Sequence, residues 1–283
     1  PLVKDLQHLA ENGIQLKNND SPIFGALSTI STDNLGAHQL AGLTRSFSTG
    51  RVCRFCMILH SDIKQTFSEQ ECCLRTADSH ARHVMTVAEH TQLAKSTYGV
   101  VSGCAFDSLH YFSTIDTFVP DVMHDVLEGV VPSIILGVLR NLNSNGILSL
   151  KDFNSLLQQF KFMKHDRTAR PVVIAQRSLN DNSFSGKAAE KWCLARVLPL
   201  ILRDHVKLHN PYWQVFLTLR AIMDIIFASV VTVEDTEVLE TLINDFLEEC
   251  SILHSEYMTP KFHYMVHYPS QSDCTFTSII VPY

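Results

Sequence analysis

The fold prediction depends most on the segment Pro22-Ile23-Phe24-Gly25-Ala26-Leu27-Ser28-Thr29-Ile30-Ser31-Thr32-Asp33-Asn34-Leu35-Gly36. Residues 22–32 alternate loosely between apolar and polar side chains and are rich in Ile, Phe, Leu and Thr, which is typical of a β-strand. That strand would deliver Asp33 at its end, where nuclease-like folds place a Mg²⁺-binding carboxylate. Taken alone, an Asp before Asn-Leu-Gly is more typical of a turn in which the side chain bonds to its own backbone. The residues leave both interpretations open.

Helical patterns dominate the rest of the chain. Residues 36–47 predict a short helix, and a long apolar stripe begins beyond Asp121, with Val122, Val126, Ile134, Val138 and Leu142 at helical spacing. Further helices are predicted at about 151–163, 187–207, 212–231 and 235–256. The predicted fold class is therefore α+β, with a small α/β portion that leads into an all-α block.

Composition and charge limit the function. The 283 residues are 46% hydrophobic and 18% charged, which predicts a globular protein and excludes a disordered one. A net charge of −6 does not fit a protein that binds DNA phosphates through a broad basic face. The densest basic segment holds Lys161, Lys164, His165, Arg167 and Arg170, a scatter that is more typical of a solvated loop than of a DNA track.

The sequence predicts no membrane span. Its longest strongly apolar run, residues 130–139, is interrupted by Pro132 and Ser133 and is far shorter than a bilayer requires. There is no signal peptide pattern at the start of the sequence. The eight cysteines have irregular spacing, so we expect a soluble protein from a reducing compartment.

A CxxC pair at Cys53 and Cys56 is the most specific chemical motif. Two thiolates can supply half of a tetrahedral zinc site, which needs two further ligands. We select His124 and His80 as metal ligands beside the two cysteines; the other candidates are His60, His83, Cys72 and Cys73. A pair of reduced thiols in a turn is the alternative interpretation.

His124 opens the long apolar helix, with Asp125 beside it and Glu128 one turn later. A neutral imidazole oriented by a neighbouring carboxylate suits a metal ligand. A partly buried structural histidine is the alternative.

The order of these motifs resembles a known family. The segments 31–56 and 107–132, with Asp-Asn-Leu-Gly, CxxC and Met-His-Asp-x-Leu-Glu-Gly-Val, are similar to the DDE transposase domain of the CACTA/EnSpm type, as found in animal transposon-derived proteins. The later Lys261-Phe-His-Tyr-Met-Val-His-Tyr-Pro269 is similar to a segment near the end of that domain. The resemblance covers about Leu2 to Pro269.

The resemblance implies a division of the chain and a role for each motif. Residues 1–120 would be a partial RNase H-like segment with the CxxC knuckle, 121–269 an all-α insertion, and 270–283 an atypical tail. Asp33 would be the second acid of an Asp-Asp-Glu triad, and Cys53, Cys56 and His124 would form a zinc knuckle with a structural ion. By the same resemblance, Mg²⁺ would be the catalytic cofactor of the parent family. DNA would be the partner of this chain, and the protein would be located in the nucleus.

The departures from the family pattern decide the expected activity. No acid before Asp33 fits the first catalytic position, and no acid follows the 261–269 segment in a helical pattern. We therefore expect a fragment or relic of a transposase that is inactive alone, because one carboxylate cannot assemble a two-ion site. One alternative is a domesticated DNA-associated or protein-interaction scaffold that uses its helical block. Another is an unrelated zinc enzyme built on His263 and His267, whose i,i+4 spacing places both on one helix face.

Overall fold

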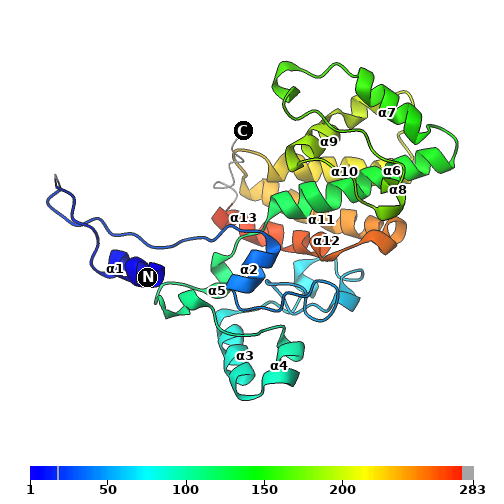
Figure 1. Cartoon of the computed structure of the whole chain (residues 1–283). Helices are drawn as coiled ribbons and strands as arrows, with labels where there is room; N and C mark the ends of the chain where they lie inside the picture. The colour runs from blue at the N-terminus through cyan, green and yellow to red at the C-terminus, as the bar shows by residue number, and fades with distance from the viewer. Residues whose placement is uncertain (18, 276–283) are drawn as a thin grey trace. The chain divides into compact units, whose positions relative to one another are not determined.

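The computed structural model describes residues 1–17 and 19–275, without the side chains of 91–93 and 272–275. Of the predicted tail 270–283, residues 276–283 lie outside the described part. The chain divides into two compact units (Figure 1). The first unit comprises residues 1–61 and 72–121, and the second comprises residues 62–71 and 122 onward.

The predicted α+β fold class with an RNase H-like portion is wrong. Helices account for 58% of the structure and strands or bridges for 4%, and the described residues form no sheet. The segment 22–32 is extended but pairs only at two points, Ile23 with Ile14 and Ile30 with Phe118. Its composition makes the chain extended, but no neighbouring segment supplies the continuous ladder that a strand needs. Ile23 and Phe24 are accordingly exposed.

The helices follow in chain order; the label η marks 3-10 helices and, for η4, a π-helix. They are α1 (Leu2–Glu11), α2 (Asn34–Leu40), η1 (His60–Asp62), η2 (Glu69–Glu71), α3 (Ala77–Glu89), α4 (Thr91–Tyr98), η3 (Ala105–Ser108), α5 (Thr114–Thr117), η4 (Met123–Val130), α6 (Val131–Ser144), α7 (Leu150–Gln159), η5 (Lys164–Asp166), α8 (Ser178–Asp181), α9 (Ala188–Leu202), α10 (Pro211–Ile226), α11 (Val233–Leu253), η6 (Ser255–Tyr257), α12 (Pro260–Tyr264), η7 (Met265–His267) and α13 (Tyr268–Thr275). Beyond residue 121, helices lie where all five were predicted, with ends shifted by a few residues, but the first begins as the π-helix η4 before it continues as α6.

The first unit has a small core under short helices. Side chains from α2, α3 and α4 meet Phe118 in this core, whose buried members are Ala37, Ala41, Leu43, Val87, Ala94, Val100, Cys104 and Phe118. Long connections are held by single bridges such as Leu43 with Val100 and Cys56 with Leu74. The backbone around the two cysteines is therefore fixed by isolated pairings in place of a sheet.

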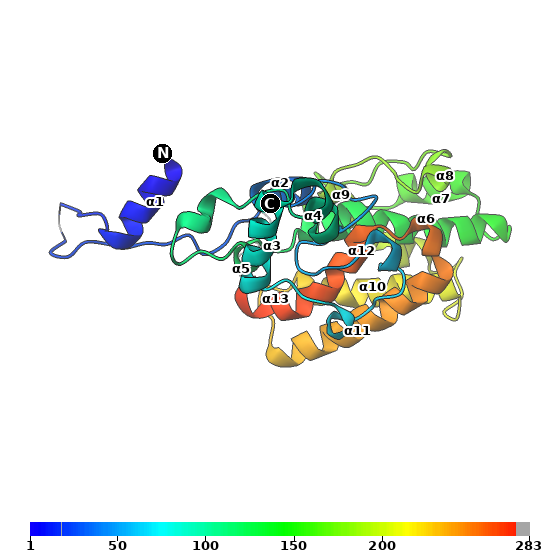
Figure 2. The ribbon, with the colours of Figure 1, turned by 90° about the horizontal axis from the view of Figure 1, so that it is seen from below.

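The second unit is a helical bundle around α6. Because ten of the fourteen residues of α6 are buried, this helix has neighbours on all sides. Helix α10 packs against both α6 and α11, and α9 also contacts α6 (Figures 1 and 2). Helix α11 buries one face, formed by Leu239, Ile243, Phe246, Leu247 and Cys250. The short segment 62–71 belongs to this unit.

Among the described residues, no helix has the length and apolar character that crossing a bilayer requires.

Candidate metal centre

The loop that carries Cys53 and Cys56 is a buried turn in the first unit. Both residues are at most 1% exposed. The Phe55 amide donates to Cys53 Sγ at 3.3 Å, so the turn already directs an N–H group at the sulfur. The Arg75 amide donates to the Phe55 carbonyl and the Met57 amide to the Cys73 carbonyl, each at 2.8 Å. These bonds fix the backbone of the turn that carries the two thiols.

Two arginines support this turn. Arg75 Nε donates to the Cys53 carbonyl at 3.3 Å, and its Nη2 donates to the Tyr98 carbonyl at 2.9 Å. Arg54 donates to Asn34 Oδ1 at 2.6 Å and to the Val119 carbonyl at 2.8 Å. Both guanidinium groups are buried, and the charge of Arg75 acts on Cys53 and Cys56, where positive charge favours the deprotonated, metal-binding form of a thiol.

Cys56 sits among other thiols. Hydrogen bonds with Cys53 and Cys72, followed by burial, raise the pKa of the Cys56 thiol far above its ordinary range. A divalent cation reverses this preference, because a coordinating thiol loses its proton to the metal. The cluster of sulfurs is therefore costly to ionise without a metal and well suited to one.

His263 and His267 lie one turn apart in the second unit, on α12 and η7. Pro260 occupies the first position of α12, where its missing N–H costs nothing. Both imidazoles are fully buried, and their ring centroids are 5.2 Å apart at an interplanar angle of 84°. His267 Nδ1 bonds to Glu69 Oε1 at 2.6 Å. With Nδ1 held in this way, Nε2 is the atom that would bind a metal.

The π-helix η4 holds the helix that carries His263. Lys261 Nζ donates to the His124 carbonyl at 2.8 Å. Gly129 leaves room for the Lys261 stem, since a Cβ at this position would lie 2.4 Å from Lys261 Cδ. The Tyr268 hydroxyl donates to the buried carboxylate of Asp125 at 3.2 Å. The Met-His-Asp-x-Leu-Glu-Gly motif therefore positions the 260–268 segment through its backbone, its carboxylate and its glycine.

The structure brings the cysteine pair and the histidine pair together. One ligand atom from each of Cys53, Cys56, His263 and His267 lies within 4.8 Å of the other three, and all four residues are buried. Two sulfurs and two imidazole nitrogens are the donor set of tetrahedral Zn²⁺ sites. Among the described residues, this buried cluster is the group that could bind a metal such as zinc.

His124 and His80 are not in this cluster. His124 Nε2 lies 3.8 Å from Glu128 Oε2 within η4. His80 is buried in α3, and neither of its ring nitrogens has a hydrogen-bond partner in the described part of the chain. Burial, followed by the charge of Arg75, lowers the pKa of His80, so its ring is neutral. His263 and His267, which the sequence offers as an alternative zinc-binding pair, lie beside the two cysteines instead.

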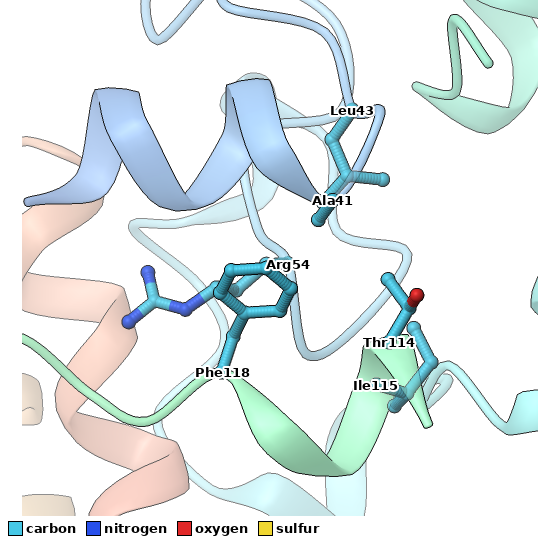
Figure 3. Close-up of a pocket in the computed structure, with 6 residues that line it drawn as sticks. All are labelled: Ala41, Leu43, Arg54, Thr114, Ile115 and Phe118. Atoms are coloured by element: carbon cyan, nitrogen blue, oxygen red, sulfur yellow. The ribbon is translucent and has the colours of Figure 1, made fainter. Parts of the chain in front are cut away.

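Asp33 caps a helix. Its Oδ1 accepts from the Gly36 amide at 2.6 Å, which satisfies one of the free N–H groups at the start of α2. Near this segment lies a hollow lined by Ala41, Leu43, Arg54, Thr114, Ile115 and Phe118, none of which carries a carboxylate (Figure 3). It leaves no space for a water-sized ligand. The described residues place no group of potential metal ligands around Asp33.

Glu69 is a functional candidate that the sequence did not reveal. It lies 198 positions from His267, and a hydrogen bond over that separation has no local signature. The i,i+4 spacing of His263 and His267 was the visible signal for the second ligand pair, but nothing in the sequence linked it to Cys53 and Cys56.

No protein-family model, no curated protein and no solved structure shows a significant match to this chain.

Proposed function

We propose that this chain is a zinc protein in which Cys53, Cys56, His263 and His267 bind one Zn²⁺ as a structural ion. The observation that carries the proposal is the buried set of two thiols and two imidazoles within 4.8 Å of one another. Four protein ligands fill a tetrahedral zinc and leave no position for water or substrate, which distinguishes structural from catalytic sites. Burial of all four groups fits the same assignment.

The surroundings of the ligands support this role. A zinc-bound histidine commonly donates its other ring N–H to a carboxylate, which fixes the ring and raises its basicity. Glu69 stands in that position beside His267. Glu69 also accepts from the Ser270 hydroxyl at 2.9 Å, so the carboxylate is itself oriented.

A bound ion would connect two segments that are far apart in the sequence. Zinc binding to a site that does not exist in the unfolded chain contributes directly to the free energy of folding. The isolated bridges around the cysteine turn supply few backbone hydrogen bonds of their own. We therefore infer that the bound ion stabilises the cysteine turn, which in other folds the hydrogen bonds of a sheet would stabilise.

The zinc content of the purified chain tests this proposal. Wild type should contain one zinc per chain, and the Cys53→Ser/Cys56→Ser and His263→Asn/His267→Asn variants should each contain much less. Cys73→Ser is the control, because this exposed neighbour lies outside the ligand cluster. Equal zinc in wild type and both double variants would refute the site.

We also propose descent from the CACTA/EnSpm-type transposases, on the strength of the ordered motifs alone. Nuclear location would follow from the same resemblance. The capping role of Asp33 supports the expectation that the chain does not cleave DNA by itself. Purified chain with Mg²⁺ or Mn²⁺ should leave supercoiled plasmid intact. Nicking that disappears in Asp33→Ala would contradict this.

The basic segment 161–170 favours a second candidate role, association with DNA. Its four lysines and arginines are exposed. Its single acid, Asp166, is buried and paired with Arg196 at 2.5 Å, so the exposed surface of the segment is positive. Phe162 lies beside Arg170, with the guanidinium 5.8 Å from the ring centroid. Contacts between these exposed cations and DNA phosphates would make the DNA-binding affinity fall strongly as the salt concentration rises.

Fluorescence anisotropy with a labelled duplex measures this second role. The Lys161→Ala/Lys164→Ala/Arg167→Ala variant should bind DNA more weakly. The slope of log K against log salt concentration should become less negative by roughly 2 to 3. A variant with three exposed cations replaced elsewhere, at Lys4, Arg45 and Lys207, is the charge-matched control. Identical slopes for the two triple variants would remove the segment from any DNA-binding role.

A further inference from the structure

A polar hollow of about 400 Å³ opens in the second unit, away from the proposed zinc ligands. Its walls come from the C-terminal half of α6, from α8, from the start of α10 and from the residues after α11. The side chains that matter for a ligand are Arg140, Asn141, Asn180, Tyr212, His254 and Glu256. Most ligand pockets are lined mainly by apolar groups, so this wall selects a polar occupant.

His254 is a buried imidazole at the wall of the hollow. It is 1% exposed, and its ring lies directly on Gly137, where a Cβ would be 2.0 Å from its Cε1. Tyr212 packs edge-on against the ring at a centroid distance of 5.2 Å. Burial and the charge of Arg140 lower the pKa of His254 to about 4, so the ring is neutral at physiological pH. Its Nε2 has no hydrogen-bond partner among the described residues.

Arg140 is a fixed cation in the same wall. Its Nη1 donates to the Leu179 carbonyl and its Nη2 to Asn182 Oδ1, both at 2.8 Å. The Tyr257 ring lies under the guanidinium at 4.0 Å. In the part of the chain that the structure describes, no carboxylate lies within 4 Å of Arg140. A half-buried guanidinium that no carboxylate contacts directly can bind an oxyanion.

Glu256 limits which oxyanion fits. It is an exposed residue that lines the hollow, and its charge acts on Arg140. A simple anion would be attracted by Arg140 and repelled by Glu256. A ligand with both charges would satisfy both groups, and the Asn141 and Asn180 amides offer neutral donors and acceptors between them.

We propose that this hollow binds a small zwitterion of the amino-acid type, with its carboxylate toward Arg140 and His254 and its ammonium group toward Glu256. The site is independent of the proposed zinc centre, and it assigns the second unit a ligand-binding role. The fixed fork of Arg140 would contribute directional donors to the carboxylate, and the neutral ring of His254 would form part of the adjoining wall.

Ligand-observed saturation-transfer NMR on the full chain tests the site. The probes are individual L-amino acids at millimolar concentration, with acetate and methylammonium as fragments that carry one charge each. At least one amino acid should receive saturation and bind at least about tenfold more tightly than either fragment, because two charge-assisted contacts replace one. A panel in which no amino acid receives saturation, or in which acetate binds as well as any amino acid, would overturn the proposal.

Two variants separate recognition from folding. Glu256→Gln alters an exposed side chain, so the fold should persist; amino-acid affinity should fall about two- to fivefold while acetate binding does not weaken. Arg140→Gln should abolish carboxylate binding, with circular dichroism to show that the helices remain. Full amino-acid affinity in a folded Arg140→Gln or in Glu256→Gln would also refute the assignment.

Discussion

The sequence allows Asp33 to be either a metal ligand or a helix cap, and the surrounding structure favours the cap. Its carboxylate accepts the Gly36 amide at 2.6 Å and begins α2. A capping role depends on an acceptor oxygen at short reach and not on negative charge, whereas metal binding in a nuclease site depends on the charge. The two roles therefore respond differently to the same conservative substitution.

We predict that Asp33→Ala lowers the free energy of unfolding by about 1 kcal/mol, because the helix loses its N-cap. Asp33→Asn should be close to neutral, since Asn caps helices as well as Asp does. Urea denaturation of the two variants and wild type measures the difference. Equal destabilisation by Asn and Ala would show that the charge, and not the cap, matters at this position.

Glu69 provides a second test at the scale of one residue. Glu69→Ala should reduce zinc affinity about 10- to 100-fold, because His267 loses the carboxylate that orients its ring. Glu69→Gln should have a smaller effect, since its amide oxygen can still accept from Nδ1. Competition with a chromophoric chelator measures the affinities, with exposed Glu237→Gln as control. If Glu69→Ala binds zinc as tightly as the control, the positioning role is wrong.

The sequence predicted the two ligand pairs separately but not that they lie together. The CxxC spacing predicted Cys53 and Cys56 as candidate ligands, and the i,i+4 spacing set His263 and His267 apart as a pair. Their combination depends on tertiary structure, which no local pattern encodes. Neighbouring acids in the sequence favour His124 as a ligand, yet its backbone carbonyl, and not its ring, accepts from Lys261.

At the scale of elements, close contact between α6 and the end of α11 depends on a glycine. Gly137 lies in the middle of α6, and the His254 ring occupies the space that a side chain would need. Alanine in place of glycine within a helix usually stabilises it by about 0.5–1 kcal/mol. Here the missing Cβ is the reason that the two elements can approach.

We predict that Gly137→Ala reverses the usual sign and destabilises the protein by about 1–3 kcal/mol through overpacking against His254. Thermal or urea unfolding measures the change. The double variant Gly137→Ala/His254→Ala should recover part of the loss relative to the two single variants, because removal of the ring relieves the clash. Additive effects in this cycle would mean that the two residues do not interact.

Helices were more predictable than extended segments for a physical reason. The apolar stripe of α11 repeats within one element, so its buried face can be read from the sequence. A strand needs a partner elsewhere in the chain, and residues 22–32 have the composition of a strand but only two bridging partners. The π-helix η4 was also hidden, because its apolar spacing resembles that of an α-helix; the Val131 amide bonds to the Val126 carbonyl, five residues back.

At the scale of the whole molecule, buried neutral histidines make stability depend on pH. Burial is the main cause that lowers the pKa of His38 and of His254 from 6.5 to about 4. Between these values the unfolded chain binds protons that the folded chain excludes. The contribution of these two neutral histidines to the free energy of unfolding is therefore fully present above pH 6.5 and is lost as the pH falls toward 4.

We predict a loss of about 3 kcal/mol for each of the two histidines between pH 7 and pH 4. Urea unfolding at pH 7 and pH 4 measures this loss, and His38→Gln should flatten the pH dependence, because it removes one titrating group. His165→Gln is the control, since its side chain is 68% exposed. An unchanged pH dependence in His38→Gln would contradict the assignment.

We propose that zinc organises the chain through two sulfurs and two nitrogens. X-ray absorption at the zinc edge of the purified wild-type protein measures this coordination, because the nearest atoms to the ion report ligand type and distance. We predict a four-coordinate shell with two Zn–S distances of about 2.3 Å and two Zn–N distances of about 2.0–2.1 Å. A shell dominated by oxygen, or protein that purifies without zinc and does not take it up, would rule out this zinc centre.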